Sequence, residues 1–371
     1  MKINRRTFVI GTASTAVAGY AESRKAGSKT ESTRLTGKIR VAQIGLQGHC
    51  NIVLNGLLKT EDCELVAVAR SMPGEAIESL KKNPACTEHT RMYDDYRKML
   101  DETKPDLVAV FAPYAQNGPV NIEAARRGCH VISEKPLAVT MEHLNELRRQ
   151  RDKNNIRVTA LLPFRLDPMF MAAHQAVEEG LIGEPVLISA QKSYRWRGPH
   201  RPDYYKLRKT YGGTIPWVAI HAIDFIRFVS GLEYANVTAR HAVKVHKDYP
   251  ECEDCGALLF EMKNRGQATL TFDYLRPLKA PSHGDDRIRV IGSKGVIEIR
   301  KAGKGFCELI TNEKPAHQPP LQKAKGNIFV DFVESLRSGK AHCLGPEDPF
   351  RATEVAIKAR DAADTGKTIT L

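Results

Sequence analysis

The sequence has no apolar run that approaches the roughly 20 residues a membrane-spanning helix requires, so we expect no membrane span. Its 371 residues contain only eight cysteines, too few and too scattered for a disulfide scaffold. Cys252 and Cys255 form a lone C-x-x-C pair, and no second pair completes a zinc site. A structural role and a disulfide formed after export both remain open for this pair, and we predict no metal site.

The first 37 residues have the pattern of a targeting segment. Asn4-Arg5-Arg6-Thr7-Phe8-Val9 precede a short apolar stretch that contains the small-residue run Ala16-Val17-Ala18. A basic start, a short apolar core and small residues at a cleavage site make up a signal peptide. Paired arginines followed by Phe favour the twin-arginine route, which carries folded proteins and suits a chain that captures a cofactor before export. We therefore expect an exported, periplasmic protein with residues 22–37 as a polar spacer.

Length and net charge limit the domain number and the kinds of ligand that we expect for the chain after residue 37. Its length is large for one hydrophobic core and favours two domains. The formal net charge of the whole chain is +13, and the part outside the leader indicates at most a preference for anionic ligands. Basic and aromatic residues alternate between positions 194 and 211, beginning with Tyr194-Arg195-Trp196-Arg197. Such a run clamps nucleic acid in some proteins, but it equally suits a sugar face and a carboxylate, or a solvated loop.

The export signal weighs against nucleic acid as the ligand of this run. We therefore expect a small-molecule partner, a sugar or a sugar acid.

Residues 38–160 alternate strand-like and helix-like stretches, which predicts a doubly wound parallel sheet. The first strand–helix–strand unit spans residues 38–69, and such a unit offers backbone N–H groups at a helix N-terminus to a pyrophosphate. Its turn reads Gly45-Leu46-Gln47-Gly48-His49-Cys50 and departs from the G-x-G-x-x-G pattern at Gln47 and Cys50. By itself this turn is a weak signal for a dinucleotide.

The end of the second predicted strand bears on the choice of cofactor. An acid at this place would bind a ribose 2′-hydroxyl, but the chain reads Ala69-Arg70-Ser71. An arginine and a hydroxyl suit a 2′-phosphate instead. We therefore expect NADP rather than NAD, with a solvated loop arginine as the plain alternative.

A lysine stands at the carboxyl end of a later strand. The run Ile132-Ser133-Glu134-Lys135-Pro136 follows a strand-like stretch and precedes a helical pattern over residues 140–154. Right-handed crossovers bring Gly45, Ala112-Pro113 and Lys135 to one edge of the sheet. In open α/β sheets this edge is where ligands bind.

Residues 161–371 predict a second domain of a different kind. Strand-like runs with a period of two favour an open, mostly antiparallel sheet with helices on one face and the other face exposed. The exposed face makes a homodimer or homotetramer plausible. The predicted strands cover residues 186–193, 237–245, 256–261, 268–274, 287–291 and 295–300.

One predicted helix of this domain carries polar residues among apolar ones. Gly212-Gly213-Thr214 form a turn, and Pro216 suits a first helical position. In the helix that follows, Trp217, His221 and Asp224 fall at i, i+4 and i+7, on one stripe. A stripe with a histidine and an acid favours a functional face over a purely structural one, although a hydrogen-bonded core histidine is the alternative.

Taken together, these motifs resemble the Gfo/Idh/MocA family, which includes glucose–fructose oxidoreductase and inositol dehydrogenase. The resemblance rests on the Gly45 turn, Glu134-Lys135-Pro136, the Arg165 strand end, and Gly212-Gly213 followed by His221. It implies a Rossmann domain, an α+β domain with an open sheet, and NAD(P)-dependent hydride transfer at a secondary hydroxyl of a sugar or polyol.

The resemblance also implies roles for individual residues. Lys135 and His221 match the catalytic residues of the family, and Arg165, Tyr194, Trp217 and Asp224 are candidates for binding the substrate. The candidates for binding the cofactor are Gly45, Gln47, Gly48, His49, Arg70, Ser71, Ala112, Pro113, Asn117, Glu134, Lys135 and Arg165.

The chain departs from the family pattern beside the histidine. Trp217 stands where the family often has an acid four residues earlier, and Ala219 stands where it often has glycine. Two other functions therefore stay open. One is an NAD(P)-dependent glycosidase or lyase that oxidises a sugar transiently before elimination. The other is a sugar-binding protein without catalysis.

Overall fold

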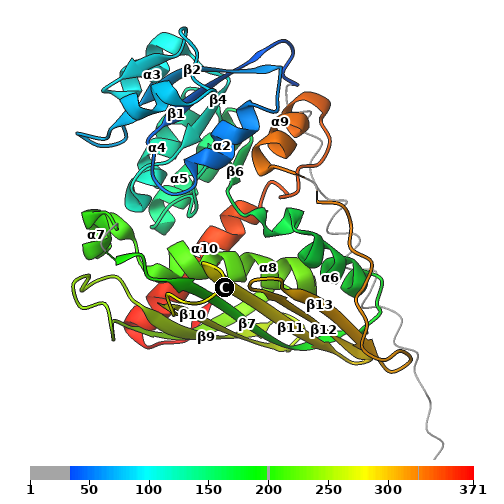
Figure 1. Cartoon of the computed structure of the whole chain (residues 1–371). Helices are drawn as coiled ribbons and strands as arrows, with labels where there is room; N and C mark the ends of the chain where they lie inside the picture. The colour runs from blue at the N-terminus through cyan, green and yellow to red at the C-terminus, as the bar shows by residue number, and fades with distance from the viewer. Residues whose placement is uncertain (1–33, 199–200, 325) are drawn as a thin grey trace, which may run out of the picture.

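The computed structural model describes residues 34–198, 201–324 and 326–371 (Figure 1). The predicted signal peptide and most of the spacer lie outside these ranges. Two sheets, each with its own helices, lie one above the other in the view of Figure 1. None of the helices in the described ranges is long and apolar enough to cross a membrane.

The first sheet has the strand order β3-β2-β1-β4-β5-β6, and all its pairs are parallel. This order is that of the doubly wound dinucleotide-binding fold, which confirms the predicted parallel sheet. Helices on both faces bury strands such as β4 completely, and its sequence is accordingly all apolar. The strands are β1 (Ile39–Ile44), β2 (Cys63–Ala69), β3 (Arg91–Tyr93), β4 (Leu107–Val110), β5 (His130–Ser133) and β6 (Val158–Ala160). The helices are α2 (Cys50–Leu57), α3 (Tyr96–Thr103), α4 (Tyr114–Arg126) and α5 (Met141–Lys153), with a 3-10 turn at Ile77–Lys82.

The second sheet has the order β13-β12-β11-β7-β10-β9-β8-β14 and is antiparallel except where β7 meets β10. This confirms the predicted open sheet. Its strands are β7 (Pro185–Arg195), β8 (Tyr234–Ala242), β9 (Cys255–Met262), β10 (Gln267–Arg276), β11 (Gly284–Gly292), β12 (Gly295–Lys301), β13 (Phe306–Thr311) and β14 (Ile369–Thr370). The helices that follow β6 along the chain are α6 (Pro168–Glu178), α7 (Arg208–Tyr211), α8 (Ile220–Ser230), α9 (Ile328–Ser338) and α10 (Asp348–Thr365), with 3-10 turns at Pro163–Leu166 and Asp203–Lys206.

Helices α6, α8 and α10 cover one face of this sheet (Figure 1). Buried and exposed residues alternate along β10, as expected for a strand with one solvated face. The solvated face carries exposed apolar side chains such as Val186, Leu259 and Phe306. Self-association through this face stays a prediction.

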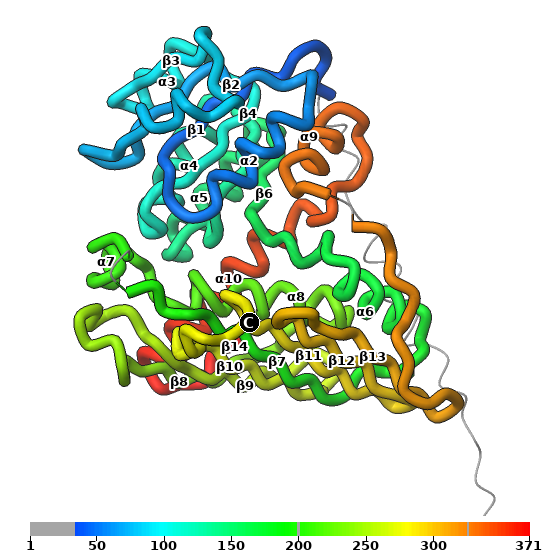
Figure 2. The backbone as a smooth tube through the Cα atoms, viewed as in Figure 1, coloured from blue at the N-terminus to red at the C-terminus, as the bar shows by residue number. Residues whose placement is uncertain are grey.

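Helix α9 returns to the first domain and packs beside α2 (Figures 1 and 2). A Cβ added at Gly56 would lie 2.6 Å from the Phe329 ring, so the glycine allows this close approach. Asn327 Nδ2 donates a hydrogen bond to the Ile52 carbonyl at 2.7 Å. The predicted division into residues 38–160 and 161–371 did not anticipate this return, because nothing local in the sequence reveals which sheet a helix joins.

The helix predicted from Trp217 onwards begins differently in the structure. Ile215–Ala219 form a π-helical turn, and the regular helix α8 follows it. Pro216 lies in the first turn of this segment, where its missing N–H costs no helical hydrogen bond. A π-turn holds one more residue than an α-turn and is frequent at functional sites.

Candidate active site

The carboxyl edge of the first sheet brings together the segments that the sequence analysis placed there. Gln47 N–H donates to the Phe111 carbonyl at 2.9 Å, and Glu134 N–H donates to the Val110 carbonyl at 2.8 Å. These bonds tie the turns after β1 and β5 to β4. Ala112 and Pro113 are buried at the same edge of the sheet, between β4 and the start of α4.

The turn after β1 is a tight cradle that two glycines make possible. A Cβ on Gly45 would lie 2.2 Å from the Phe111 carbonyl oxygen, and one on Gly48 would lie 2.3 Å from Glu134 Oε2. Both glycines also have positive φ angles, +82° and +66°. In dinucleotide-binding folds the first glycine of this turn allows the sharp bend ahead of the helix N-terminus that binds the pyrophosphate. The cradle therefore fits NAD(P), although Gln47 and Cys50 break the glycine pattern.

The buried carboxylate of Glu134 joins this cradle to the catalytic candidates. Its Oε2 accepts from His49 N–H at 2.7 Å and lies 2.9 Å from His49 Nδ1, while Oε1 accepts from Lys135 N–H at 3.1 Å. Burial alone would raise the pKa of Glu134, but His49 and Lys135 bring the pKa below its ordinary value. Negative charge is thus held at the start of α2, where the helix dipole favours it.

The Lys135 side chain is fully buried beneath Trp217. Its Nζ donates to the Trp217 carbonyl at 2.6 Å and lies 3.0 Å from the centroid of the indole ring. Burial lowers the pKa of Lys135 well below its ordinary value, with Glu134 opposing the shift and Lys192 adding to it. The lysine therefore gives up its proton far more readily than a solvated lysine.

His221 lies on α8 with its ring edge-on to Phe164, at 5.6 Å between centroids. The side chain is buried, and within the described part of the chain its Nδ1 has no hydrogen-bond partner. Burial, followed by the charges of Lys135 and Lys192, lowers the pKa of His221 well below its ordinary value. A neutral imidazole with a free nitrogen is available to accept a proton.

Trp217 covers this site from the second domain. Its ring stacks on Tyr114 with centroids 3.5 Å apart and planes 13° apart, and His49 stacks on it more distantly, at 6.0 Å. The Tyr114 hydroxyl in turn lies 2.8 Å from that of Tyr205. An indole cannot take the proton-relay role of the acid that the family often has here. The structure instead makes Trp217 part of an aromatic wall beside Lys135.

A second buried lysine, Lys192 on β7, was missed by the sequence analysis. Its Nζ lies 2.6 Å from Asp286 Oδ1 on β11 and 4.5 Å from the ring centroids of Tyr194 and Phe164. Burial lowers the pKa of Lys192, but Asp286 and Tyr194 together outweigh burial and raise the pKa above its ordinary value. Alternation along β7 was the available signal, because it puts Lys192 on the covered face of the sheet. Tyr194, predicted to bind substrate, lies next to this pair.

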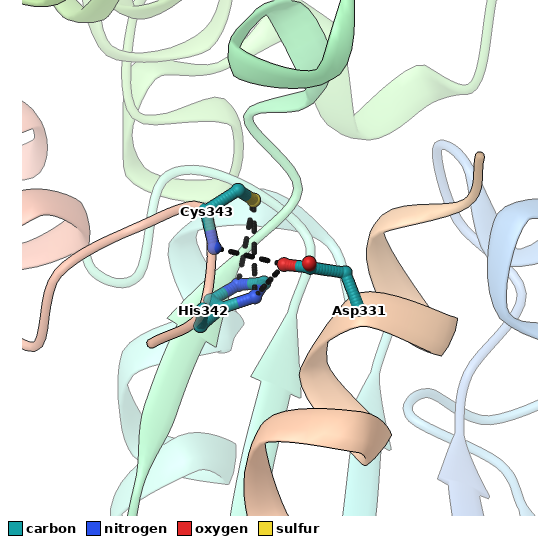
Figure 3. Close-up of side chains that lie close together, drawn as sticks. All are labelled: Asp331, His342 and Cys343. Carbon is teal, nitrogen blue, oxygen red and sulfur yellow. Dashed lines mark hydrogen bonds and ion pairs between the residues drawn. The ribbon is translucent and has the colours of Figure 1, made fainter. Parts of the chain in front are cut away.

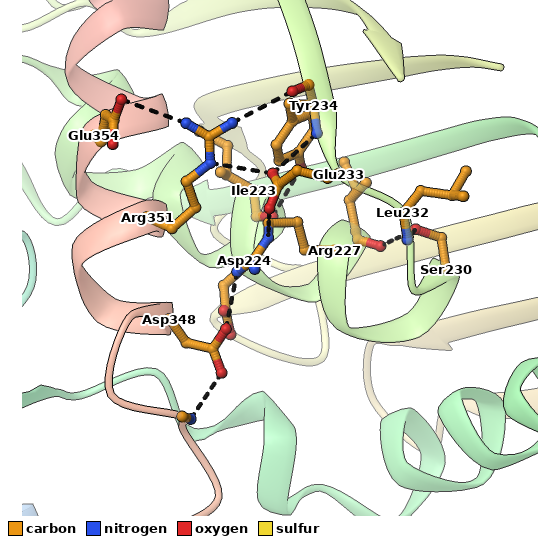
Figure 4. A network of polar contacts seen from close by, with 12 residues as sticks. Ile223, Asp224, Arg227, Ser230, Leu232, Glu233, Tyr234, Asp348, Arg351 and Glu354 are labelled. Atoms are coloured by element: carbon orange, nitrogen blue, oxygen red, sulfur yellow. Dashed lines mark hydrogen bonds and ion pairs between the residues drawn. The ribbon is translucent and has the colours of Figure 1, made fainter. Parts of the chain in front are cut away.

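Arg165 and Asp224 form an ion pair with each other. Arg165 Nη2 is 2.7 Å from Asp224 Oδ1, and Nη1 is 2.7 Å from Asp348 Oδ2. Asp348 also accepts from Arg227 at 3.0 Å (Figure 4), so the charges form a chain between α8 and α10. All these groups are largely buried and satisfied within the protein. The geometry therefore favours a structural role over the ligand contacts predicted for Arg165 and Asp224.

The remaining cofactor candidates fall into two groups. Asn117 is buried, and its Nδ2 donates hydrogen bonds to the carbonyls of Glu134 and Pro136, at 3.3 and 3.2 Å. These bonds hold the loop after β5 that carries Lys135. Arg70 and Ser71 line a cavity of about 490 Å³ between the loops that follow β2 and β3, formed by residues 70–74 and 94–97. The place suits the adenosine half of a dinucleotide.

Asp331, His342 and Cys343 form a compact cluster behind β6 (Figure 3). His342 Nδ1 bonds Asp331 Oδ2, and Nε2 lies 3.0 Å from Thr159 Oγ1. Cys343 Sγ is almost equidistant from the two ring nitrogens, at 3.8 and 3.9 Å, and so lies over the ring. A metal would need a ring lone pair that these bonds already use. The cluster fastens α9 to the first sheet.

The buried network predicts a stability effect for Asp224→Ala. Removing one partner of a buried ion pair leaves Arg165 with less compensation, and we expect the free energy of unfolding to fall by about 3–5 kcal/mol. Denaturant titration followed by circular dichroism measures this change. Glu64→Gln is the control, because Glu64 pairs with Lys38 at the exposed surface and its loss should have no measurable effect. An unchanged stability together with a raised KM would instead identify Asp224 as a substrate ligand.

Comparisons with known proteins agree with this architecture. Residues 39–161 match the family model described as "Oxidoreductase family, NAD-binding Rossmann fold", and residues 170–298 match "GFO/IDH/MocA C-terminal domain". A solved structure of a putative oxidoreductase from Thermotoga maritima is 36% identical, covers 90% of this chain and 100% of its own, and superposes with a TM-score of 0.83.

Two curated relatives have known activities. Myo-inositol 2-dehydrogenase of Thermotoga maritima is 25% identical over 90% of this chain and 98% of its own. D-glucoside 3-dehydrogenase of Escherichia coli is 26% identical over 61% of this chain and 64% of its own.

Proposed function

Because the chain belongs to the GFO/IDH/MocA family of NAD-binding oxidoreductases, we propose that it transfers a hydride to or from a secondary hydroxyl carbon of a sugar or polyol. The observation that carries the proposal is the presence of two buried titratable groups, Lys135 and His221, beside a dinucleotide cradle. Relatives named as inositol and glucoside dehydrogenases support the substrate class.

The residues that would hold the cofactor follow from the cradle. The turn from Gly45 to His49 and the start of α2 would bind the pyrophosphate, and Glu134 and Lys135 would face the nicotinamide half. When bound, NAD(P) supplies the acceptor or donor of the hydride. The chain itself has to bind the sugar, exclude water and move one proton.

The proton of the sugar hydroxyl passes to His221 in the direction of oxidation. Its lowered pKa keeps the imidazole neutral, and its Nδ1 has no competing partner among the described residues. Lys135 stabilises the alkoxide that develops as the proton leaves, because a buried ammonium acts in a low-dielectric site. The Glu134 carboxylate accepts a hydrogen bond from the Lys135 backbone N–H and so holds the lysine in place.

The surroundings of Lys135 combine aromatic and polar side chains. Trp217 and Tyr114 stack on each other beside Lys135 and supply the apolar part of these surroundings. Lys192, Asp286 and Tyr194 provide polar groups across the same space. A few placed polar groups within an apolar pocket are typical of small-molecule sites.

Replacing the lysine tests the proposal directly. We expect Lys135→Met to lower kcat/KM by about 10²–10³-fold, because it removes the charge that stabilises the alkoxide. The measurement is cofactor reduction with a panel of inositols and glucosides, alongside binding of NADH. The exposed Lys153→Met, at the end of α5, is the matched control. Near-normal turnover by the Lys135 variant would contradict the assignment.

The pH profile tests the role of His221. Lys192→Met removes a positive charge that lowers the pKa of His221 and leaves Asp286 unpaired, so the pKa of the imidazole should rise. Oxidation needs the neutral imidazole, and the acid limb of kcat/KM should therefore move to higher pH.

The limb is measured from about pH 5 to pH 9, with exposed Lys38→Met as the control of equal charge change. A limb that stays in place or moves to lower pH would exclude His221 as the base.

We also propose that the chain is exported by the twin-arginine route, on the strength of Arg5-Arg6 and the small-residue stretch that follows. The double substitution R5K/R6K should leave the protein in the cytoplasm, because the paired arginines are the recognised feature. Fractionation of a bacterial host that expresses each variant measures this. Arg24→Lys, in the spacer, should export normally. Equal export of all variants would contradict the route.

A further inference from the structure

The carboxylate of Glu75 occupies a place that the sequence analysis did not assign. Its Oε1 accepts from Leu46 N–H at 2.8 Å and from Gln47 Nε2 at 2.9 Å. Its Oε2 accepts from Ser71 N–H and from Ser71 Oγ, each at 2.8 Å. Glu75 thus bridges the turn after β1 and the end of β2, and it is buried, with 7% of its surface exposed.

This gap is where an adenosine ribose lies in a dinucleotide-binding fold. An acid near the end of the second strand commonly accepts the ribose hydroxyls there. The chain has Arg70 at the strand end, but Glu75 reaches the same gap from the loop five residues later. A side chain that arrives from a loop leaves no signal at the expected position, which is why the sequence pattern missed it.

Arg70 is not free to bind a 2′-phosphate. Its Nε donates to Asp94 Oδ1 at 2.7 Å, and its Nη2 donates to Glu78 Oε1 at 2.5 Å. Two carboxylates already neutralise the one guanidinium. The buried charge between the turn after β1 and the end of β2 is that of Glu75, and it is negative.

We propose that Glu75 selects NAD over NADP by accepting hydrogen bonds from the adenosine ribose. This inference rests on the proposed function and revises the expectation that Arg70 and Ser71 select NADP. Two of the four donors to Glu75, Gln47 Nε2 and Ser71 Oγ, belong to side chains that can rotate and release lone pairs to the ribose. The two backbone donors hold the carboxylate in place. A 2′-phosphate would put like charges together inside a buried site, which disfavours NADPH.

The test compares the binding of NADH and NADPH to the full chain by fluorescence or calorimetry, which needs no substrate. We expect wild-type protein to bind NADH at least about tenfold more tightly, and the isosteric Glu75→Gln to shrink that ratio at least about fivefold, mainly by improving the affinity for NADPH. Glu88→Gln removes a fully solvated carboxylate further along the same loop and should leave the ratio unchanged.

Each outcome decides a different question. Tighter binding of NADPH by the wild type would overturn this proposal alone, and that result does not depend on whether a variant folds. Equal weakening of both cofactors in Glu75→Gln would show that Glu75 only caps the turn. Failure of the wild type to bind either cofactor would overturn the proposed function, and this inference with it.

Discussion

The contact between Glu134 and the N-terminus of α2 is the interaction on which the site depends. One buried carboxylate accepts from the His49 backbone and from the Lys135 backbone, and it closes the cradle under Gly48. It thereby fixes the turn after β1 relative to the lysine after β5. A longer side chain at position 48 or a neutral one at position 134 would separate the turn after β1 from the loop that carries Lys135.

A surplus of buried positive charge follows from this arrangement. Lys135 and Lys192 lie close enough to His221 to lower the pKa of its imidazole, yet only Lys192 has a carboxylate of its own, Asp286. The two lysines therefore behave differently: the pKa of Lys135 falls and that of Lys192 rises. Lys135 therefore loses its proton more readily than a solvated lysine does, whereas Lys192 holds its proton more firmly. Such opposed environments for like groups are a common way to divide acid–base roles in an active site.

The sequence predicted the fold well because its signals are local. Alternating strands and helices, the Gly45 turn and the lysine after β5 each act within a few residues, and the strand order then follows from crossover handedness. The same holds for the second sheet, where period-two alternation marks the covered face. The return of α9 to the first domain was not predictable, since Phe329 meets Gly56 only in three dimensions.

The site was predicted less completely because its decisive contacts join distant residues. Arg165 and Asp224 were predicted to contact ligands, but they pair with each other, and Arg165 also pairs with Asp348, far along the chain. Lys192 and Asp286 meet across two strands, and Glu75 reaches the β1 turn from a loop. Trp217 and His221 were predicted on one regular helix, but a π-turn over Ile215–Ala219 precedes α8. In each case a long-range pairing or a backbone irregularity outweighed the local pattern.

The most direct test of the account is a crystal structure of the protein saturated with NADH. We predict that the nicotinamide ring lies beside Lys135 and faces His221, with the adenosine ribose against Glu75. A nicotinamide seated elsewhere, with Trp217 still closed over the Lys135 ammonium, would contradict the assignment of this edge as the active site.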